Sequence, residues 1–287
     1  MSILSFGDCI IPGEYCLHSK FTSVVNYSFN NNFLSIVSKK IDNGPVNIVV
    51  DDIIQFLEDE IIIKSQRLLC NEFVYNFEDN LQYNSEINHD VIADLKIEAV
   101  IKMLLPLLEE KAPILSLAFV FDENRKKYFK SSFERYFINK ISAGIEKLQE
   151  GKAVECAEMI HGFGFGLTPS GDDFITGMLY ALYLLQEITG KENLVSLRKN
   201  IFKAAETVNI ISLNAMKMAA NGRFGENLKG MVSALAQNNE RKIYEAVHTI
   251  LNIGATSGAD MLTGFLQTFI TENRFNCWNA PHHIILR

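Results

Sequence analysis

The spacing of apolar residues changes near residue 89 of this 287-residue chain, from a period of about two to a period of about 3.6. The first period is typical of strands with one buried face, and the second of helices with one buried stripe. The change predicts an α+β protein. Residues 1–88 are expected to form a small β-sheet or barrel-like domain, and residues 89–287 a mostly α-helical domain. The polar stretch at residues 83–90 is the expected hinge.

Short runs of β-branched and aromatic residues, separated by turn signals, predict the strands of the first domain. In residues 21–29, Phe21, Val25, Tyr27 and Phe29 recur at a spacing that puts them on one face. Gly13 and Glu14 are expected in a turn, because Pro and Gly stand together there. Turns are also expected at 30–32 and 42–45, further strands at 33–38, 46–50, 61–63 and 73–77, and a short helical turn at 51–58.

Helical spacing is clearest in residues 132–149. Its apolar positions at steps of three and four are Phe133, Tyr136, Phe137, Ile141, Ile145 and Leu148. Similar patterns predict helices at 90–111, 152–160, 170–188, 191–208, 211–220, 224–237, 240–251 and 257–271. Residues 114–121 fit either a strand or a helix. The densest basic run, Arg125 to Lys127, is expected at the solvated start of a helix.

Composition excludes several classes of function. The formal net charge of −7 argues against nucleic acid as a partner, because duplex binding needs clustered positive charge. The five cysteines contain no C-x-x-C pair, which argues against a zinc or redox motif and favours a reducing, cytoplasmic setting. The first residues lack the features of a signal peptide. The most apolar helix candidate is shorter than the roughly 20 residues that span a membrane, so no membrane segment is expected.

The most informative stretch is residues 161–177, with the sequence HGFGFGLTPSGDDFITG. Glycines ahead of a helix let the backbone adopt positive φ or let a ligand approach closely. The helix is expected to start at Thr168-Pro169, since Pro is tolerated at the first helical position, or at Ser170, with Asp173 completing a capping box.

A similar pattern returns near the C-terminus. Residues 170–177 (SGDDFITG) and 257–264 (SGADMLTG) share the signature S-G-x-D-x-aliphatic-T-G. Gly254 precedes the second copy as Gly166 precedes the first. The match indicates either an internal duplication or a chance similarity between two helix starts.

Two interpretations of the first copy remain open. In the functional one, backbone N–H groups at the helix start bind a small anion such as phosphate or a carboxylate. Because Asp172 and Asp173 would repel that anion, the site needs a cation, either Mg²⁺ held by these two carboxylates or a basic side chain such as Arg223. In the structural one, Ser170 and Asp173 cap the helix and the glycines allow close packing. Arg223 would then lie in a surface loop.

The candidate residues follow from the functional interpretation. Asp172, Asp173 and His161 are the candidate catalytic residues, and Asp172 and Asp173 are the candidate metal ligands. His161 could act as a general base, although a lone His before a loop is more often structural. The candidate substrate-binding residues are Gly164, Gly166, Thr168, Ser170, Gly171, Arg223, Ser257 and Asp260.

The block GLTPSGDD at residues 166–173 resembles the hallmark of a bacterial family catalogued as a domain of unknown function or "putative carboxylase". Residues 256–260 resemble its second block, and residues 21–27 with 44–45 its opening strands. One branch of that family is the AllH-type subunit of oxamate carbamoyltransferase, which acts in allantoin breakdown beside an FdrA-like subunit and another partner. The resemblance implies a reaction that interconverts oxalurate plus phosphate with oxamate plus carbamoyl phosphate.

The sequence therefore leaves two alternative predictions of function. In the first, the chain is a subunit of a carbamoyl-transfer enzyme, and the loop at residues 164–173 binds a small anionic substrate while Asp172 or Asp173 orients Mg²⁺ or a substrate amide. In the second, the chain is a non-catalytic anion-binding or assembly subunit of a hetero-complex.

Overall fold

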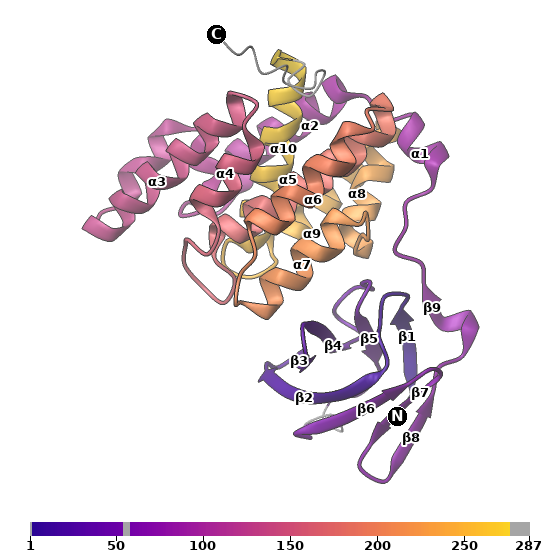
Figure 1. The fold of residues 1–287 in the computed structure, drawn as a ribbon. Coiled ribbons are helices and arrows are strands. Elements are labelled where there is room, and N and C mark those ends of the chain that lie inside the picture. Colours follow the sequence, from indigo (N-terminus) through magenta and orange to yellow (C-terminus); the bar gives the residue numbers. More distant parts are fainter. Residues whose placement is uncertain (1, 54–57, 276–287) are drawn as a thin grey trace. The chain divides into compact units, whose positions relative to one another are not determined.

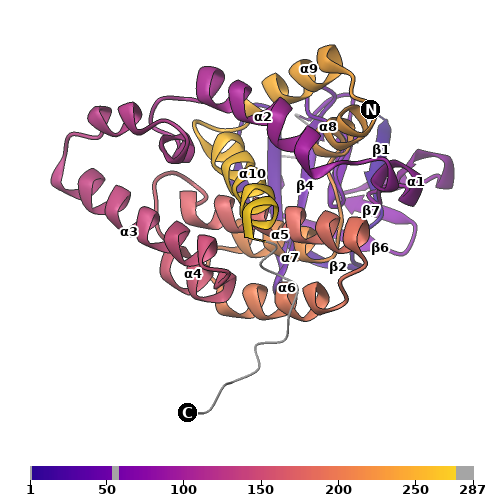
Figure 2. The ribbon, with the colours of Figure 1, turned by 90° about the horizontal axis from the view of Figure 1, so that it is seen from above.

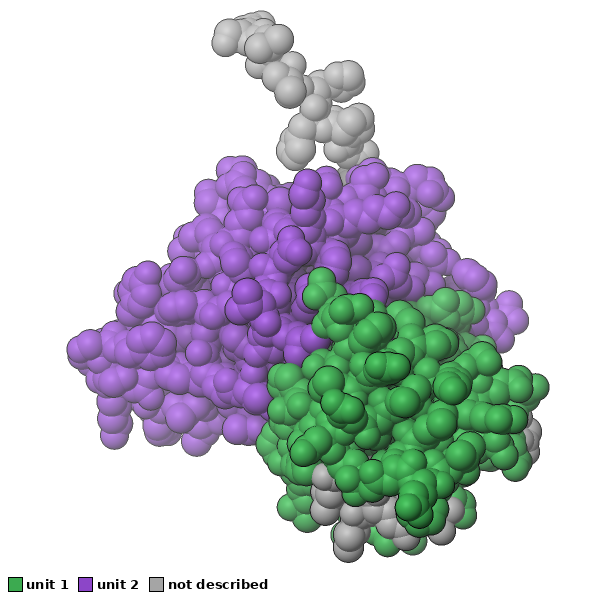
Figure 3. Space-filling model, turned by 60° about the horizontal axis from the view of Figure 1, so that its bottom comes forward, with its two compact units in different colours: residues 1–87, 223–229 green, residues 88–222, 230–287 purple. Residues whose placement is uncertain are grey.

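The computed structural model describes residues 2–53 and 58–275. The chain forms two compact units, shown in different colours in Figure 3. Unit 1 comprises residues 1–87 and 223–229, and unit 2 comprises residues 88–222 and 230–287. Unit 1 is built on a sheet and unit 2 on helices, so the α+β prediction is confirmed. The segment Arg223–Lys229 belongs to unit 1, although it lies far from that unit in the sequence.

Unit 1 is organised around one curved sheet (Figure 1). Within the described residues, its strands are β1 (Ile3–Gly7), β2 (Gly13–Lys20), β3 (Val24–Phe29), β4 (Asn32–Ser38), β5 (Asn47–Val50), β6 (Glu60–Lys64), β7 (Arg67–Cys70), β8 (Phe73–Asn76) and β9 (Gln82–Tyr83). The order across the sheet is β8-β7-β6-β2-β3-β4-β5-β1-β9. The β4–β5 and β1–β9 pairs are parallel and the other pairs antiparallel.

The sequence identified five of the nine described strands of this sheet and missed β1, β2, β7 and β9. The turn expected at Gly13 and Glu14 is wrong, because these residues begin β2 and pair with Ile63 and Ile62 of β6. β2 escaped detection because few of its residues are apolar, although Tyr15 is buried. The helical turn expected at 51–58 falls partly on residues 54–57, which lie outside the described residues.

The alternation of β3 supplies part of the core of unit 1. Val25 and Tyr27 are fully buried, and the Tyr27 hydroxyl donates to the Glu58 carbonyl at 3.0 Å. Phe21, expected on the same face, lies before β3 and is exposed. The predicted buried face therefore holds for Val25 and Tyr27, although Asn26 between them is buried as well.

The segment Arg223–Lys229 joins unit 1 through backbone and side-chain hydrogen bonds. The Phe224 N–H donates to the Ser85 carbonyl at 2.8 Å. The Phe224 carbonyl accepts from the Tyr83 hydroxyl at 3.1 Å. The Glu226 carboxylate accepts from both the backbone N–H and the side-chain amide of Asn43, at 3.0 and 2.8 Å. These contacts explain why a segment between two helices is part of the unit built on the sheet.

Unit 2 is a helical assembly with α5 and α10 at its centre (Figure 2). Its helices are α1 (His89–Ala93), α2 (Ile97–Lys111), α3 (Ser132–Gln149), α4 (Ala153–Ile160), α5 (Ser170–Thr189), α6 (Asn193–Ala204), α7 (Ile210–Ala220), α8 (Glu226–Ala236, which begins in unit 1), α9 (Glu240–Leu251) and α10 (Ser257–Phe275). The single helix expected at 90–111 is two helices, and the ambiguous stretch 114–121 holds a 3₁₀ helix, η3 (Leu117–Val120). In the part of the chain that the structure describes, no helix combines the length and apolar character needed to cross a bilayer.

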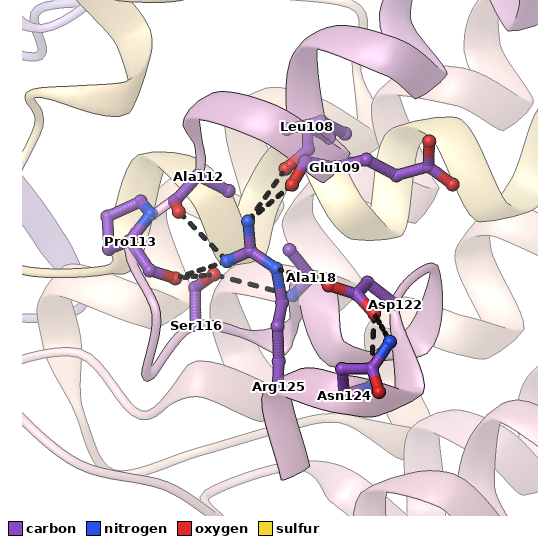
Figure 4. Close-up of polar contacts among 9 residues, drawn as sticks. All are labelled: Leu108, Glu109, Ala112, Pro113, Ser116, Ala118, Asp122, Asn124 and Arg125. Carbon is purple, nitrogen blue, oxygen red and sulfur yellow. Dashed lines mark hydrogen bonds and ion pairs between the residues drawn. The ribbon is translucent and has the colours of Figure 1, made fainter. Parts of the chain in front are cut away.

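Arg125 is buried, so the solvated basic run expected at Arg125 to Lys127 is wrong for its first residue. Arg125 lies in the 3₁₀ helix η4 (Glu123–Tyr128), and its guanidinium faces the C-terminal end of α2 (Figure 4). It donates to the carbonyls of Ala112 at 2.9 Å, Pro113 at 3.1 Å and Glu109 at 2.6 Å. Helix ends leave such carbonyls without intrahelical partners, and a cation suits the negative end of the helix dipole. Arg125 therefore has a structural role.

Candidate functional site

The two copies of the repeated signature form the contact between α5 and α10. A Cβ atom on Gly177 would lie 1.8 Å from the Met261 carbonyl oxygen, and one on Gly264 would lie 2.0 Å from the Phe174 carbonyl oxygen. The contact is reciprocal, since each glycine meets the residue three positions before the glycine of the other helix. The Thr-Gly pair of each copy therefore lets the two helix backbones touch.

The Ser-Gly pair that opens each copy also has matching surroundings. A Cβ atom on Gly171 would lie 1.9 Å from the carbonyl oxygen of Ile160, at the end of α4. A Cβ atom on Gly258 would lie 1.8 Å from the carbonyl oxygen of Ile250, near the end of α9. Each helix thus starts against the last turn of the helix before it. These matching contacts favour an internal duplication over a chance similarity.

Hydroxyl and carboxyl groups cross between the two helix starts. Thr168 Oγ1 donates to Asp173 Oδ2 at 3.0 Å and lies 3.0 Å from Ser257 Oγ. The Ser257 hydroxyl also lies against the Asp173 carboxyl, and the Ser170 hydroxyl against the Asp260 carboxyl. The serine of each copy therefore faces the aspartate of the other copy.

This arrangement perturbs the titration of both aspartates. Burial, followed by the nearby charge of Asp260, raises the pKa of Asp173 to about 8. Burial raises the pKa of Asp260 to about 7, although hydrogen bonds from Leu117 N and Ser170 oppose the change. Asp260 is fully buried, whereas Asp173, Thr168 and Ser257 are half-buried. At neutral pH, Asp173 therefore holds a proton that it can donate from a partly accessible position.

Asp172 faces a different set of partners. Its side chain is fully buried, and its Oδ1 accepts from the Gly162 N–H at 2.6 Å. Burial raises the pKa of Asp172, while the Gly162 N–H, Ser212 and the nearby His161 lower it. Asp172 therefore holds the glycine-rich loop against α5.

The expected Mg²⁺ site does not fit this arrangement. Asp172 and Asp173 bind separate protein donors, so their carboxylates are not presented together to one ion. Among the described residues, no group of three or more His, Cys, Asp or Glu side chains is arranged to hold a metal ion. A metal requirement stays a prediction.

The glycine-rich loop folds over the start of α5. The Gly171 N–H donates to the Phe163 carbonyl at 2.8 Å, and the Asp172 and Asp173 N–H groups donate to the Pro169 carbonyl at 2.9 and 3.1 Å. A Cβ atom on Gly164 would lie 2.3 Å from the Ser170 nitrogen, so the loop backbone covers that amide. These backbone N–H groups are turned toward the protein, so they are not available to the predicted anion-binding site.

The local prediction for the helix start was half right. Gly162, Gly164 and Gly166 adopt positive φ, as expected for these glycines. The capping box expected between Ser170 and Asp173 is wrong, because Pro169 is the N-cap and Ser170 is the first helical residue. The Ser170 hydroxyl is free to reach Asp260 for that reason.

The remaining predicted residues lie elsewhere. His161 is half-buried and ends α4, where its N–H donates to the Ala157 carbonyl at 3.0 Å. Arg223 belongs to unit 1 and forms ion pairs with Asp8 at 3.3 Å and Glu86 at 2.8 Å. The structure thus brings together Thr168, Ser170, Asp173, Ser257 and Asp260 within unit 2.

Sequence reasoning missed three residues that support this group. The Asn209 side-chain amide donates to the Leu167 carbonyl at 2.7 Å, and Asn209 also caps α7. The Leu117 N–H donates to Asp260 Oδ1 at 2.6 Å, and Ser212 approaches the Asp172 carboxyl. Only Asn209 carried a usable signal, because Asn directly before a helical apolar run is typical of an N-cap.

Comparison with known proteins identifies the segment that contains this site. The family model described as oxamate carbamoyltransferase subunit AllH matches residues 159–269. The matched residues run from the end of α4 into α10 and include both copies of the repeated signature. No solved structure matches the chain.

Proposed function

We propose that the chain is one subunit of an oxamate carbamoyltransferase-like enzyme, because the family model described as oxamate carbamoyltransferase subunit AllH matches residues 159–269. The enzyme would transfer a carbamoyl group between phosphate and a small amide acid in purine or allantoin catabolism. The observation that carries the assignment is that the matched segment contains the starts of both α5 and α10, where Thr168 and Ser257 meet.

Asp173, Thr168 and Ser257 are the groups proposed to meet the substrate. They are half-buried and joined by hydrogen bonds, and Asp173 is protonated at neutral pH. A protonated carboxyl donates a hydrogen bond without repelling an anion. This arrangement removes the like-charge difficulty that two ionised aspartates would pose for an oxamate or oxalurate carboxylate. In this proposal the Asp173 carboxyl, and not the backbone N–H groups of the loop, donates the hydrogen bond to the substrate.

The chemistry of the transfer gives the protonated carboxyl a role. In the direction that consumes oxalurate, a phosphate oxygen attacks the carbamoyl carbon, and the bond from that carbon to the oxamate nitrogen breaks. The departing nitrogen must gain a proton, which completes oxamate and leaves carbamoyl phosphate. Asp173 is the proposed donor, because a general acid works best with a pKa near the operating pH.

Turnover by the reconstituted complex tests this proposal. The chain is co-produced with its partner subunits, and phosphate-dependent loss of oxalurate is followed for wild type, Asp173→Asn and the exposed control Asp94→Asn. Asp173→Asn is expected to lower kcat by about a hundredfold or more while the complex still assembles. Wild-type turnover in Asp173→Asn would refute the role of Asp173. Chelation of divalent ions in the same assay tests the Mg²⁺ prediction.

A non-catalytic assembly role is the second candidate, supported by the inward-turned amides of α5 and the fully buried Asp172 and Asp260. In that case the hydroxyl and carboxyl groups at the starts of α5 and α10 only hold these two helices together. Ser170→Ala and Asp173→Asn would both lower thermal stability, and neither would change the turnover of complexes that assemble. A loss of turnover confined to Asp173→Asn supports the enzymatic role instead.

A further inference from the structure

Aromatic side chains on α3 and on the glycine-rich loop form an exposed cluster, the aromatic face, made of Phe133, Tyr136, Phe163 and Phe165. The exposed fractions of Phe133, Tyr136 and Phe165 are 49%, 57% and 42%. Ring centroids lie 5.2 Å apart for Phe133 and Phe165 and 5.5 Å apart for Tyr136 and Phe163. Single exposed apolar residues are ordinary, but several in mutual contact on one face indicate an interaction site.

Packing beneath the aromatic face holds it in place. The fully buried Phe137 stacks on Phe163 with centroids 5.9 Å apart and meets Phe165 at 5.1 Å. α3 itself begins with a complete capping box between Ser131 and Glu134, which fixes the turn that carries Phe133. Rigid aromatic anchors lose little conformational freedom on binding, and such residues dominate the energetics of protein interfaces.

Basic residues stand close in sequence to the aromatic face, although the chain as a whole is acidic. Residues 126–140 contain five cations, Lys126, Lys127, Lys130, Arg135 and Lys140, and a single carboxylate, Glu134. The Glu134 carboxylate accepts from the backbone N–H groups of Lys130 and Ser131 at 2.9 and 2.7 Å. Lys140 Nζ lies 4.7 Å from the centre of the Phe163 ring. Lys126 is also paired with Glu123 at 2.7 Å, so the excess positive charge of the segment comes from Lys127, Lys130, Arg135 and Lys140.

We infer that the aromatic face and its basic residues dock an acidic, apolar-centred surface of another subunit of the enzyme. The inference rests on the proposed function, which makes the chain one subunit of several. A second copy of this chain is disfavoured, because a two-fold interface here would bring two basic segments together. An acidic partner instead complements them.

A partner bound at the aromatic face would also contact the glycine-rich loop, which is part of the candidate site. Phe163 and Phe165 are in the aromatic face, while Gly162 and Thr168 of the same loop bind Asp172 and Asp173. The Asn209 side chain fixes the loop again at Leu167. A partner on the aromatic rings therefore contacts the segment that positions the site.

Binding of the chain to its FdrA-like partner subunit tests the inference, with matched substitutions on α9 as controls. The charge-reversed pair Lys130→Glu with Arg135→Glu and the pair Phe133→Ala with Tyr136→Ala are each expected to raise Kd at least about tenfold. The controls Arg241→Glu and Tyr244→Ala, on exposed side chains of α9, are expected to bind like wild type. Added salt is expected to weaken the wild-type complex and to have little effect on the charge-reversed pair.

The outcomes separate this inference from the proposed function. Wild-type affinity in both pairs overturns the inference, even if the complex transfers carbamoyl groups. Reduced affinity in both pairs supports it, even if the wild-type complex is inactive, in which case only the proposed function fails. Self-association, or binding to phosphatidylserine vesicles, that is lost in these variants would also overturn it. Circular dichroism melting verifies the fold, and Lys130→Gln with Arg135→Gln replaces the reversed pair if that pair unfolds.

Discussion

Thr168 Oγ1 and Ser257 Oγ lie 3.0 Å apart, although 89 positions separate the two residues in the sequence. Thr168 stands two residues before the first copy of the repeated signature and Ser257 begins the second. Thr168 donates to the Asp173 carboxyl, and Ser257 lies against the same carboxyl. One carboxyl is thereby shared between the starts of α5 and α10. Thr168, Asp173 and Ser257 therefore connect the two central helices, and they are also the most accessible part of the candidate site.

The first prediction concerns this joint. Thr168→Val and Ser257→Ala are each expected to lower the free energy of unfolding by about 1 kcal/mol, because each removes a hydrogen bond to a shared network. The double variant should lose less than the sum of the two, since both residues act on Asp173. Denaturant unfolding of the four proteins measures the coupling. Strict additivity would show that the two hydroxyls act independently.

The second prediction concerns the contact between helix backbones. Gly177→Ala is expected to lower the free energy of unfolding by about 3 kcal/mol or more, because the added Cβ would meet a backbone oxygen that cannot rotate away. Gly230→Ala on α8 is the control, since its Cβ meets nothing within 4 Å, and it should raise stability by about 0.5–1 kcal/mol. Thermal melting compares them, and equal stability of the two variants would contradict the reciprocal contact.

The third prediction concerns pH. The pKa of Asp173, about 8, and that of Asp260, about 7, both lie above the ordinary value of a carboxyl, so the folded protein binds more protons than the unfolded chain between these limits. Their contribution to stability is fully present below the ordinary pKa and is lost as pH rises through the raised values. Unfolding free energy should therefore fall from pH 5 to pH 9.

Asp173→Asn isolates one of the two groups. The decline should become shallower in this variant, because one of the carboxyls with a raised pKa has gone, while the exposed control Asp94→Asn keeps the wild-type profile. An identical decline in wild type and Asp173→Asn would mean that Asp173 does not titrate in this range.

The parts of the fold that depend on local pattern could be predicted from the sequence. The apolar stripe of residues 132–149 gave α3 with its observed bounds, and the repeated signature located the starts of α5 and α10. The first feature depends on the spacing of apolar side chains, and the second on glycines that precede a helix. The buried positions Val25 and Tyr27 of β3 were predicted for the same reason.

Features that depend on tertiary contact could not be predicted in this way. The exchange of serine–aspartate partners between the two copies requires that α5 and α10 lie together, which no local pattern states. Arg125 looked like part of a solvated basic run because its carbonyl partners are contributed by the end of α2. Arg223 stands between two helices in the sequence, yet its ion pairs are with residues of unit 1.

The pH dependence of oxamate binding to the assembled complex tests the central claim most directly. If a protonated Asp173 donates to the anion, calorimetric affinity should fall as pH rises through about 8 in wild type, and Asp173→Asn, whose amide donates without titrating, should show no such fall. Affinity that does not change with pH in wild type, or the same fall in Asp173→Asn, would contradict the account.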